Sequence, residues 1–144
     1  MFKPDTCCTL VPYFEVPEGQ LAAFKGLGPQ FVERTRTEPG CMHYAFSFNG
    51  TTAHCREGYV NAEAVLAHLQ NVGELLGQAL QIAKIVRLEV HAPAAEPEAA
   101  WWAAIEGIQG GAGGLTVIDN GDGTLTIDGT TIVDNLDGTL TIGA

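Results

Sequence analysis

A tight-turn signal lies in the middle of the first ninety residues. The dipeptide Asn49-Gly50 separates two runs, residues 41–48 and 52–59, that are rich in apolar, aromatic and β-branched side chains. Asn-Gly tolerates the positive φ angles of a two-residue hairpin loop, so the runs are predicted to pair as antiparallel strands. With Asn49-Gly50 as the loop, Tyr44 lies opposite Cys55. Such a hairpin must bury one face, so neighbouring helices or strands have to pack against that face.

Helix and strand patterns on both sides of the hairpin complete the fold. Residues 7–14 are short and apolar and predict a strand, and residues 85–90 alternate as a half-buried strand. Apolar side chains recur at helical spacing after Pro17, and again after Asn61, which is a suitable N-cap. The second helix is predicted to break at Asn71-Val72-Gly73. The order β-α-β-β-α-β predicts an α+β, ferredoxin-like domain.

Charge divides the chain into two regions. All seven Lys and Arg residues lie within residues 1–92, and residues 93–144 hold eight acidic residues and no base. We therefore expect a domain over 1–92, a linker over 93–114 and a separate tail over 115–144. The net charge of −10 argues against a nucleic-acid partner or a membrane partner bound through a basic surface.

Neither a membrane-spanning helix nor a secretory signal is predicted from the sequence. No apolar run reaches the roughly 18–20 residues that cross a bilayer. The first residues lack a basic segment followed by an apolar stretch, so we expect no secretory signal. The four cysteines, without C-x-x-C spacing, are predicted to be reduced thiols in buried strands. Together these features predict a cytoplasmic protein.

The tail is a tandem repeat. Residues 119–127 read DNGDGTLTI and residues 134–142 read DNLDGTLTI, so eight of nine positions match at an offset of fifteen residues. Each unit places an Asp-Gly turn between two short β-branched runs, which predicts two 15-residue β-hairpins. The repeats resemble segments common in phage virion proteins and bacterial surface modules.

Two isolated hairpins of this size are marginal in water, so the tail needs a partner surface. That surface is the body of the chain, a neighbouring subunit or another protein. Paired tryptophans in the linker favour an interface as well. The predicted interaction residues are Trp101, Trp102, Leu125, Ile127, Leu140 and Ile142.

Four side chains are candidates for catalysis. Tyr44 and His54 lie on the hairpin strands with Glu57, and His68 lies on the second helix. A buried histidine beside a carboxylate can remove a proton from a phenol. Strand alternation places His54 on one face and Glu57 on the other, so the four cannot share one pocket. The alternative is a structural hydrogen-bonded network.

No metal site and no cofactor site is predicted. The dense aspartates of the tail do not match the twelve-residue calcium loop, and turns use Asp and Asn for their own backbone hydrogen bonds.

Four segments carry a family resemblance. They are Val16-Pro17-Glu18-Gly19, Glu33-Arg34-Thr35-Arg36-Thr37-Glu38-Pro39-Gly40-Cys41, His54-Cys55-Arg56-Glu57-Gly58-Tyr59 and Ala67-His68-Leu69. Over about residues 5–92 the chain resembles the antibiotic biosynthesis monooxygenase (ABM) superfamily, particularly small bacterial members assigned as quinol monooxygenases. The resemblance implies a homodimer whose sheets form an α+β barrel, and a pocket between each sheet and its helices.

The resemblance implies two activities, of which one does not fit. Some members oxidise quinols or polycyclic phenols with dioxygen and without a cofactor. Others degrade haem with an Asn on the first strand and a Trp and a His further on. Here the first strand carries Cys7, Cys8 and Thr9, and no Trp precedes Trp101, which argues against haem degradation.

Two functions follow as hypotheses. The first is a cofactor-free monooxygenase, or a binder, acting on a small aromatic molecule. The second is an assembly protein of a virion, shell or filament, or shell-loaded cargo, whose tail (residues 115–144) pairs with neighbouring subunits.

Overall fold

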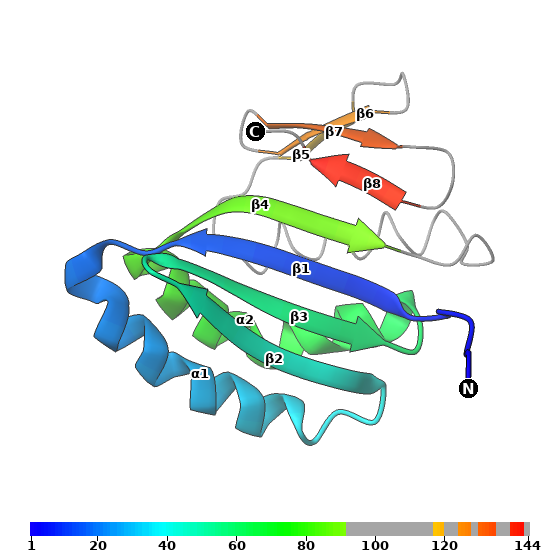
Figure 1. The fold of residues 1–144 in the computed structure, drawn as a ribbon, viewed down its shortest axis with the longest axis horizontal. Coiled ribbons are helices and arrows are strands. Elements are labelled where there is room, and N and C mark those ends of the chain that lie inside the picture. Colours follow the sequence, from blue (N-terminus) through cyan, green and yellow to red (C-terminus); the bar gives the residue numbers. More distant parts are fainter. Residues whose placement is uncertain (92–116, 120–123, 128–129, 135–138, 143–144) are drawn as a thin grey trace.

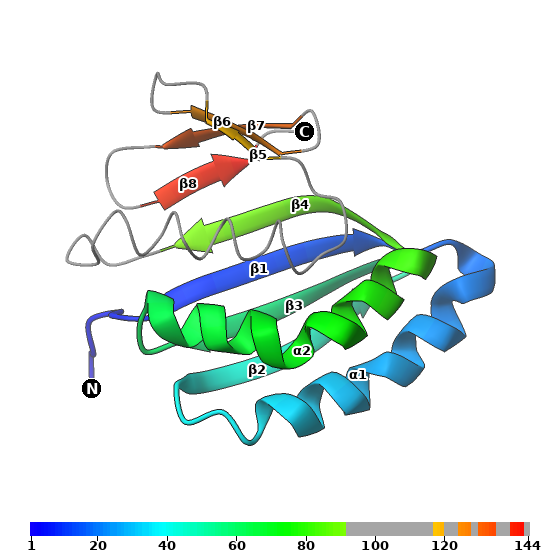
Figure 2. The ribbon, with the colours of Figure 1, turned by 180° about the vertical axis from the view of Figure 1, so that it is seen from behind.

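The computed structural model describes residues 1–91, 117–119, 124–127, 130–134 and 139–142. The first part is a β-α-β-β-α-β domain, so the predicted α+β, ferredoxin-like order is confirmed. Helices α1 and α2 cover the same face of the sheet, and no helix of the described residues lies on the opposite face (Figure 1, Figure 2). The elements in chain order are β1 (Cys8–Glu15), η1 (Glu18–Gln20), α1 (Leu21–Thr35), β2 (Cys41–Asn49), β3 (Thr52–Tyr59), α2 (Ala62–Ile82) and β4 (Lys84–His91).

All pairings within the domain are antiparallel, and the strands lie in the order β2-β3-β1-β4. The central strand β1 contains Pro12, which has no N–H to donate. Its ladder with β3 runs from Cys8 to Glu15 and is interrupted between Leu10, paired with Glu57, and Tyr13, paired with His54.

The β2–β3 hairpin forms, but its register differs from the predicted one. Asn49 pairs with Thr52, so the loop is Gly50-Thr51 and Gly50 adopts a φ of +58°. Asn49 is therefore the last residue of its strand, and Gly50 supplies the positive φ of the turn without steric cost. Tyr44 therefore lies opposite Glu57 rather than Cys55. This shift brings two of the candidate catalytic side chains side by side.

Helix α2 is continuous, which corrects the predicted break at Asn71-Val72-Gly73. Asn61 caps it as expected, accepting a hydrogen bond of 2.9 Å from the Ala64 backbone N–H. Gly73 costs about 1 kcal/mol in a helix interior. Its neighbours keep the helical spacing of a buried face, and that burial outweighs the cost. The buried face comprises Ala62, Val65, His68, Leu69, Val72, Leu75 and Ala79.

The hydrophobic core fills the space between the sheet and the two helices. Phe24 and Phe31 of α1 pack with Phe14 of β1, and α2 adds Val72 and Leu75. Rings of Phe14 and Phe24 lie 5.2 Å apart, and Phe31 lies 5.7 Å from Phe46. This layer positions the polar side chains described below.

Four further strands continue the sheet beyond β4. They are β5 (Val117–Asp119), β6 (Thr124–Ile127), β7 (Thr130–Asp134) and β8 (Thr139–Ile142). Strand β8 is antiparallel to β4, with Val90 paired to Leu140, and the order continues β4-β8-β7-β6-β5. The segments between these strands, including the predicted turns, lie outside the described residues. The sequence between β6 and β7 is a further Asp-Gly pair, which sequence analysis did not count as a turn.

Among the described residues, no helix has the length and apolar character to span a bilayer.

Candidate functional site

A buried carboxylate on β3 is the centre of the site. Glu57 points toward the helices, its exposed fraction is 5%, and it lies on the face opposite His54, as strand alternation predicts. The hydroxyl of Tyr59, two residues further along the same face, donates a hydrogen bond of 2.7 Å to Oε2 of Glu57. Tyr44 lies opposite Glu57 on β2. A carboxyl group buried this deeply must be compensated by hydrogen bonds or hold a proton.

His68 of α2 lies against this carboxylate. The imidazole is 2% exposed, and its ring centroid is 5.2 Å from the rings of both Tyr44 and Tyr59. Nε2 lies 3.6 Å from Oε2 of Glu57. Nδ1 lies 3.0 Å from Oε2 and 3.1 Å from Oε1 of Glu38, on the opposite side of the ring. His68 therefore bridges two carboxylates that the chain separates by nineteen positions.

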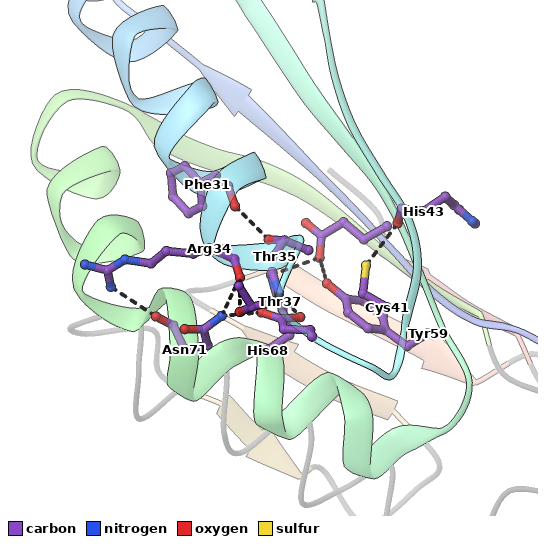
Figure 3. A network of polar contacts seen from close by, with 11 residues as sticks. Phe31, Arg34, Thr35, Thr37, Cys41, His43, Tyr59, His68 and Asn71 are labelled. Atoms are coloured by element: carbon purple, nitrogen blue, oxygen red, sulfur yellow. Dashed lines mark hydrogen bonds and ion pairs between the residues drawn. The ribbon is translucent and has the colours of Figure 1, made fainter.

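Glu38 belongs to the short connection between α1 and β2. Asn71, one helical turn after His68 on α2, donates a hydrogen bond of 2.6 Å to Oε1 of Glu38 and one of 3.1 Å to the carbonyl of Arg34. Arg34 returns a hydrogen bond of 3.1 Å to the carbonyl of Asn71. This reciprocal pair fixes the end of α1 to the middle of α2 (Figure 3). Glu38 is held in place as a consequence.

Burial governs the protonation of the site. Desolvation raises the pKa of Glu57 above its usual range, against the opposing effects of His68 and the Tyr59 hydroxyl. Desolvation also raises the pKa values of Tyr44 and Tyr59, and the nearby Glu57 charge raises them further. The Cys55 thiol has a raised pKa for the same two reasons. The two tyrosine hydroxyls and the Cys55 thiol therefore stay neutral, and Glu57 is the group at this site whose raised pKa suits it to exchange a proton.

An apolar cavity adjoins these groups. Three polar side chains, Tyr44, Glu57 and His68, line it among aliphatic and aromatic neighbours. Its volume is about 50 Å³, which is room for a water molecule or two. A benzene-sized guest needs a cavity of roughly 150 Å³. An aromatic substrate must therefore displace part of the lining, which includes the half-buried Phe46 and Leu76.

The structure does not bring His54 into this site. Its neighbours Ala53 and Cys55 are buried, whereas His54 stacks on Tyr13, with ring centroids 5.2 Å apart. The guanidinium of Arg87 lies 5.2 Å from the Tyr13 ring on the same face. Of the four predicted catalytic residues, Tyr44, Glu57 and His68 meet at the cavity, and His54 lies on the face of the sheet opposite α1 and α2.

Sequence analysis missed Glu38 as a site residue. There Glu38 appeared only within a segment that carries the family resemblance, and thirty positions separate it from His68. A signal was nevertheless present on α2, because His68 and Asn71 are three residues apart and share a helix face. Two polar residues on an otherwise apolar face indicate a polar partner across it.

The remaining predicted residues lie outside what the structure describes. Trp101 and Trp102 fall in the linker, which is not described. Leu125, Ile127, Leu140 and Ile142 fall on β6 and β8, where only the backbone pairing is described. Among the described residues, no group of three or more His, Cys, Asp or Glu side chains is arranged to hold a metal ion.

Comparison with solved structures identifies the class of the protein. MupZ from Pseudomonas fluorescens is 44% identical to this chain and superposes on it with a TM-score of 0.61. The match covers 74% of this chain and 81% of the MupZ chain. Two proteins assigned to the antibiotic biosynthesis monooxygenases, from Chloroflexus aurantiacus and Bacteroides thetaiotaomicron, are 16% and 13% identical. They cover 64% and 63% of this chain and 97% and 92% of their own, with TM-scores of 0.52 and 0.55, and show the shared fold.

These matches place the first part of the chain among the ferredoxin-like α+β proteins. The chain belongs to the ABM superfamily, as the sequence motifs predicted. No protein-family model and no curated protein matches the chain.

Proposed function

We propose that the chain is a cofactor-independent enzyme that binds a small, largely apolar molecule in the cavity and acts on it by proton transfer through Glu57. The observation that supports this is a buried, hydrogen-bonded carboxyl group of raised pKa on the wall of an apolar cavity. Buried acids of this kind are typical of sites that exchange protons with a bound substrate.

The family resemblance suggests the substrate class. A quinol or phenol offers an apolar ring for the cavity and one acidic hydroxyl for Glu57. Its deprotonation gives a phenolate, which donates an electron to dioxygen far more readily than the neutral phenol does. The second hydroxyl of a quinol can reach Tyr44, whose pKa is raised by burial and by Glu57, so that it remains a neutral hydrogen-bond donor.

The experiment is oxygen consumption with a panel of quinols, followed by product mass determination. We expect uptake with at least one quinol, and a loss of about 10²–10⁴-fold in kcat for Glu57→Gln, the range of general acid–base catalysis. Glu74→Gln is the matched control, since Glu74 is an exposed glutamate on the same domain that pairs with Arg34. Absence of oxygen uptake and of binding across the panel would remove the proposal.

A homodimer is proposed as the working form. The face of the sheet opposite α1 and α2 supports this, because it holds the exposed Val86 and Met42 beside the Tyr13–His54 stack. Packing two such faces would bury the apolar side chains and give the barrel that the family resemblance implies. Light scattering should report about twice the 15.2 kDa of one chain.

Assembly through the tail is the second candidate function. Its support is the strand order, in which β8 extends the sheet from β4 and β5 is left as the outer strand. An outer strand presents unpaired N–H and C=O groups to a further strand. Truncation before Gly110, followed by light scattering, tests this function. An unchanged number of chains per particle and the retention of every bound partner would exclude it.

A further inference from the structure

We infer that Glu38 is a positioning residue that acts through His68 and determines where the proton of Glu57 is held. This inference rests on the proposed function, in which Glu57 exchanges a proton with the substrate. Glu38, His68 and Glu57 form one line of contacts across the imidazole ring, from the connection after α1 through α2 to β3.

The contacts of Glu38 assign the histidine tautomer. Asn71 donates to Oε1 of Glu38, and Nδ1 of His68 lies 3.0 Å from Oε2, so both oxygens serve as acceptors. A carboxylate accepts two such bonds, and Nδ1 must then carry the hydrogen. The lone pair of Nε2 consequently faces Glu57. Nδ1–H donated to a carboxylate is the arrangement that fixes a catalytic imidazole in other enzymes.

The proton can then move in two balanced steps. In the first, the O–H bond of the substrate breaks and an O–H bond forms on the Glu57 carboxylate. In the second, that O–H bond breaks and an N–H bond forms on Nε2 of His68. The product of the second step is an imidazolium between two carboxylates, with Glu57 ready to act again. The return of the proton to a later intermediate reverses both steps.

One distance has to shorten for the second step. Nε2 and Oε2 of Glu57 are 3.6 Å apart, which is longer than a hydrogen bond. Contacts of this kind commonly tighten when substrate binds. The Nδ1 contact is already at hydrogen-bond distance, so Glu38 orients the ring before the Nε2 contact forms.

Other titratable side chains surround the His68 imidazole and decide which charges it can pair with. Besides Glu38 and Glu57, the titratable side chains near His68 are Tyr44 of β2 and Tyr59 of β3, with Cys41 and Cys55 beside Glu57. Burial raises the pKa values of these two tyrosines and two thiols, so they stay neutral. The side chain of Arg34 pairs instead with Glu74, away from the ring. Glu38 and Glu57 are therefore the two counter-charges of an imidazolium at His68, and Glu38 is the one already at hydrogen-bond distance.

The experiment is nitrogen-15 NMR of the full-length protein labelled in histidine, with the wild type, Glu38→Gln and the control Glu74→Gln. We expect a protonated Nδ1 at His68 in the wild type and in Glu74→Gln across the neutral pH range. In Glu38→Gln we expect a mixture of the two tautomers, because an amide can donate or accept. An unprotonated Nδ1 in the wild type would overturn the inference, and this result does not depend on the variant folding.

Kinetics provide the second readout and separate the two proposals. With any quinol that is turned over, Glu38→Gln should lose at least about tenfold in kcat. Its pH–rate profile should shift while KM changes little. Equal rates and profiles for Glu38→Gln and Glu74→Gln would overturn the inference even if Glu57→Gln is inactive. If no quinol is turned over, the proposed function fails while the tautomer assignment stands on the spectra.

Discussion

Gly40 provides the sharpest test of the packing that builds the site. A Cβ added at this glycine would lie 2.5 Å from Cβ of Ala64 and 3.5 Å from Cα of the same residue. Carbon atoms in contact normally stay about 3.5–4.0 Å apart, so Gly40→Ala creates an overlap of about 1 Å. The obstacle is a methyl group on the first turn of α2, which cannot rotate out of the way. The backbone of α2 must move instead.

Two hydrogen bonds resist that movement. The Asn61 side chain caps α2 at 2.9 Å, and the Val60 N–H donates to the carbonyl of Gly40 at 3.0 Å. Overpacking of this kind costs typically about 1–3 kcal/mol of unfolding free energy. Because His68 follows Ala64 by one helical turn, a displaced α2 also lengthens its contacts with Glu38 and Glu57. We therefore expect Gly40→Ala to lose stability and His68 orientation together.

Gly58→Ala is the matched control. Its added Cβ would lie even closer, 2.0 Å from the ring of His43, but that ring is an exposed, rotatable side chain. We expect a loss below about 1 kcal/mol, partly offset by the better strand propensity of alanine. Urea unfolding followed by circular dichroism gives both values. A Gly40→Ala variant that is as stable as the wild type, or less affected than Gly58→Ala, would refute the reasoning.

Three further predictions follow from single contacts. Tyr59→Phe removes the donor to the buried Glu57 and should lower the unfolding free energy by about 1–3 kcal/mol, measured by urea titration; no loss would contradict the 2.7 Å bond. Asn61→Ala removes the cap of α2 and should cost about 1 kcal/mol, while Asn61→Asp should restore most of it in the same assay. Burial raises the pKa of Cys41 to about 11, so at pH 8 its thiolate fraction is about 100-fold below that of an ordinary thiol. Burial raises the pKa of Cys7 too, but less than that of Cys41, so mass spectrometry should find iodoacetamide on Cys7 before Cys41, and labelling of Cys41 first would contradict the assignment.

Local patterns in the sequence predicted the elements of the first domain well. Periods of two and of 3.6 residues indicated the strands and helices in the right order, because each element buries one face. The same period placed Glu57 and His54 on opposite faces of β3, as the structure has them. The predicted hairpin register was wrong because the loop is Gly50-Thr51 and not Asn49-Gly50. Asn49 could either end the strand or begin the turn, and the sequence did not distinguish the two.

Features that depend on tertiary contacts were not predictable in this way. The break expected in α2 does not occur because the buried face continues through Val72 to Leu75, and this burial outweighs the local preference of Gly73. Glu38 meets His68 only after α1 and α2 pack together, so no spacing along the chain reveals the pair. The alternation of β3 separated Glu57 from His54, whereas the face that Glu57 occupies and its partners depend on the tertiary packing.

A crystal structure of the protein soaked with a quinol tests the central claim most directly. The account predicts a ring in the cavity between the sheet and the helices, with one hydroxyl oxygen at hydrogen-bond distance, about 2.6–3.2 Å, from Glu57. It also predicts that Nε2 of His68 lies closer to Glu57 than the 3.6 Å seen here. A quinol bound on the other face of the sheet, beside Tyr13 and His54, would contradict it.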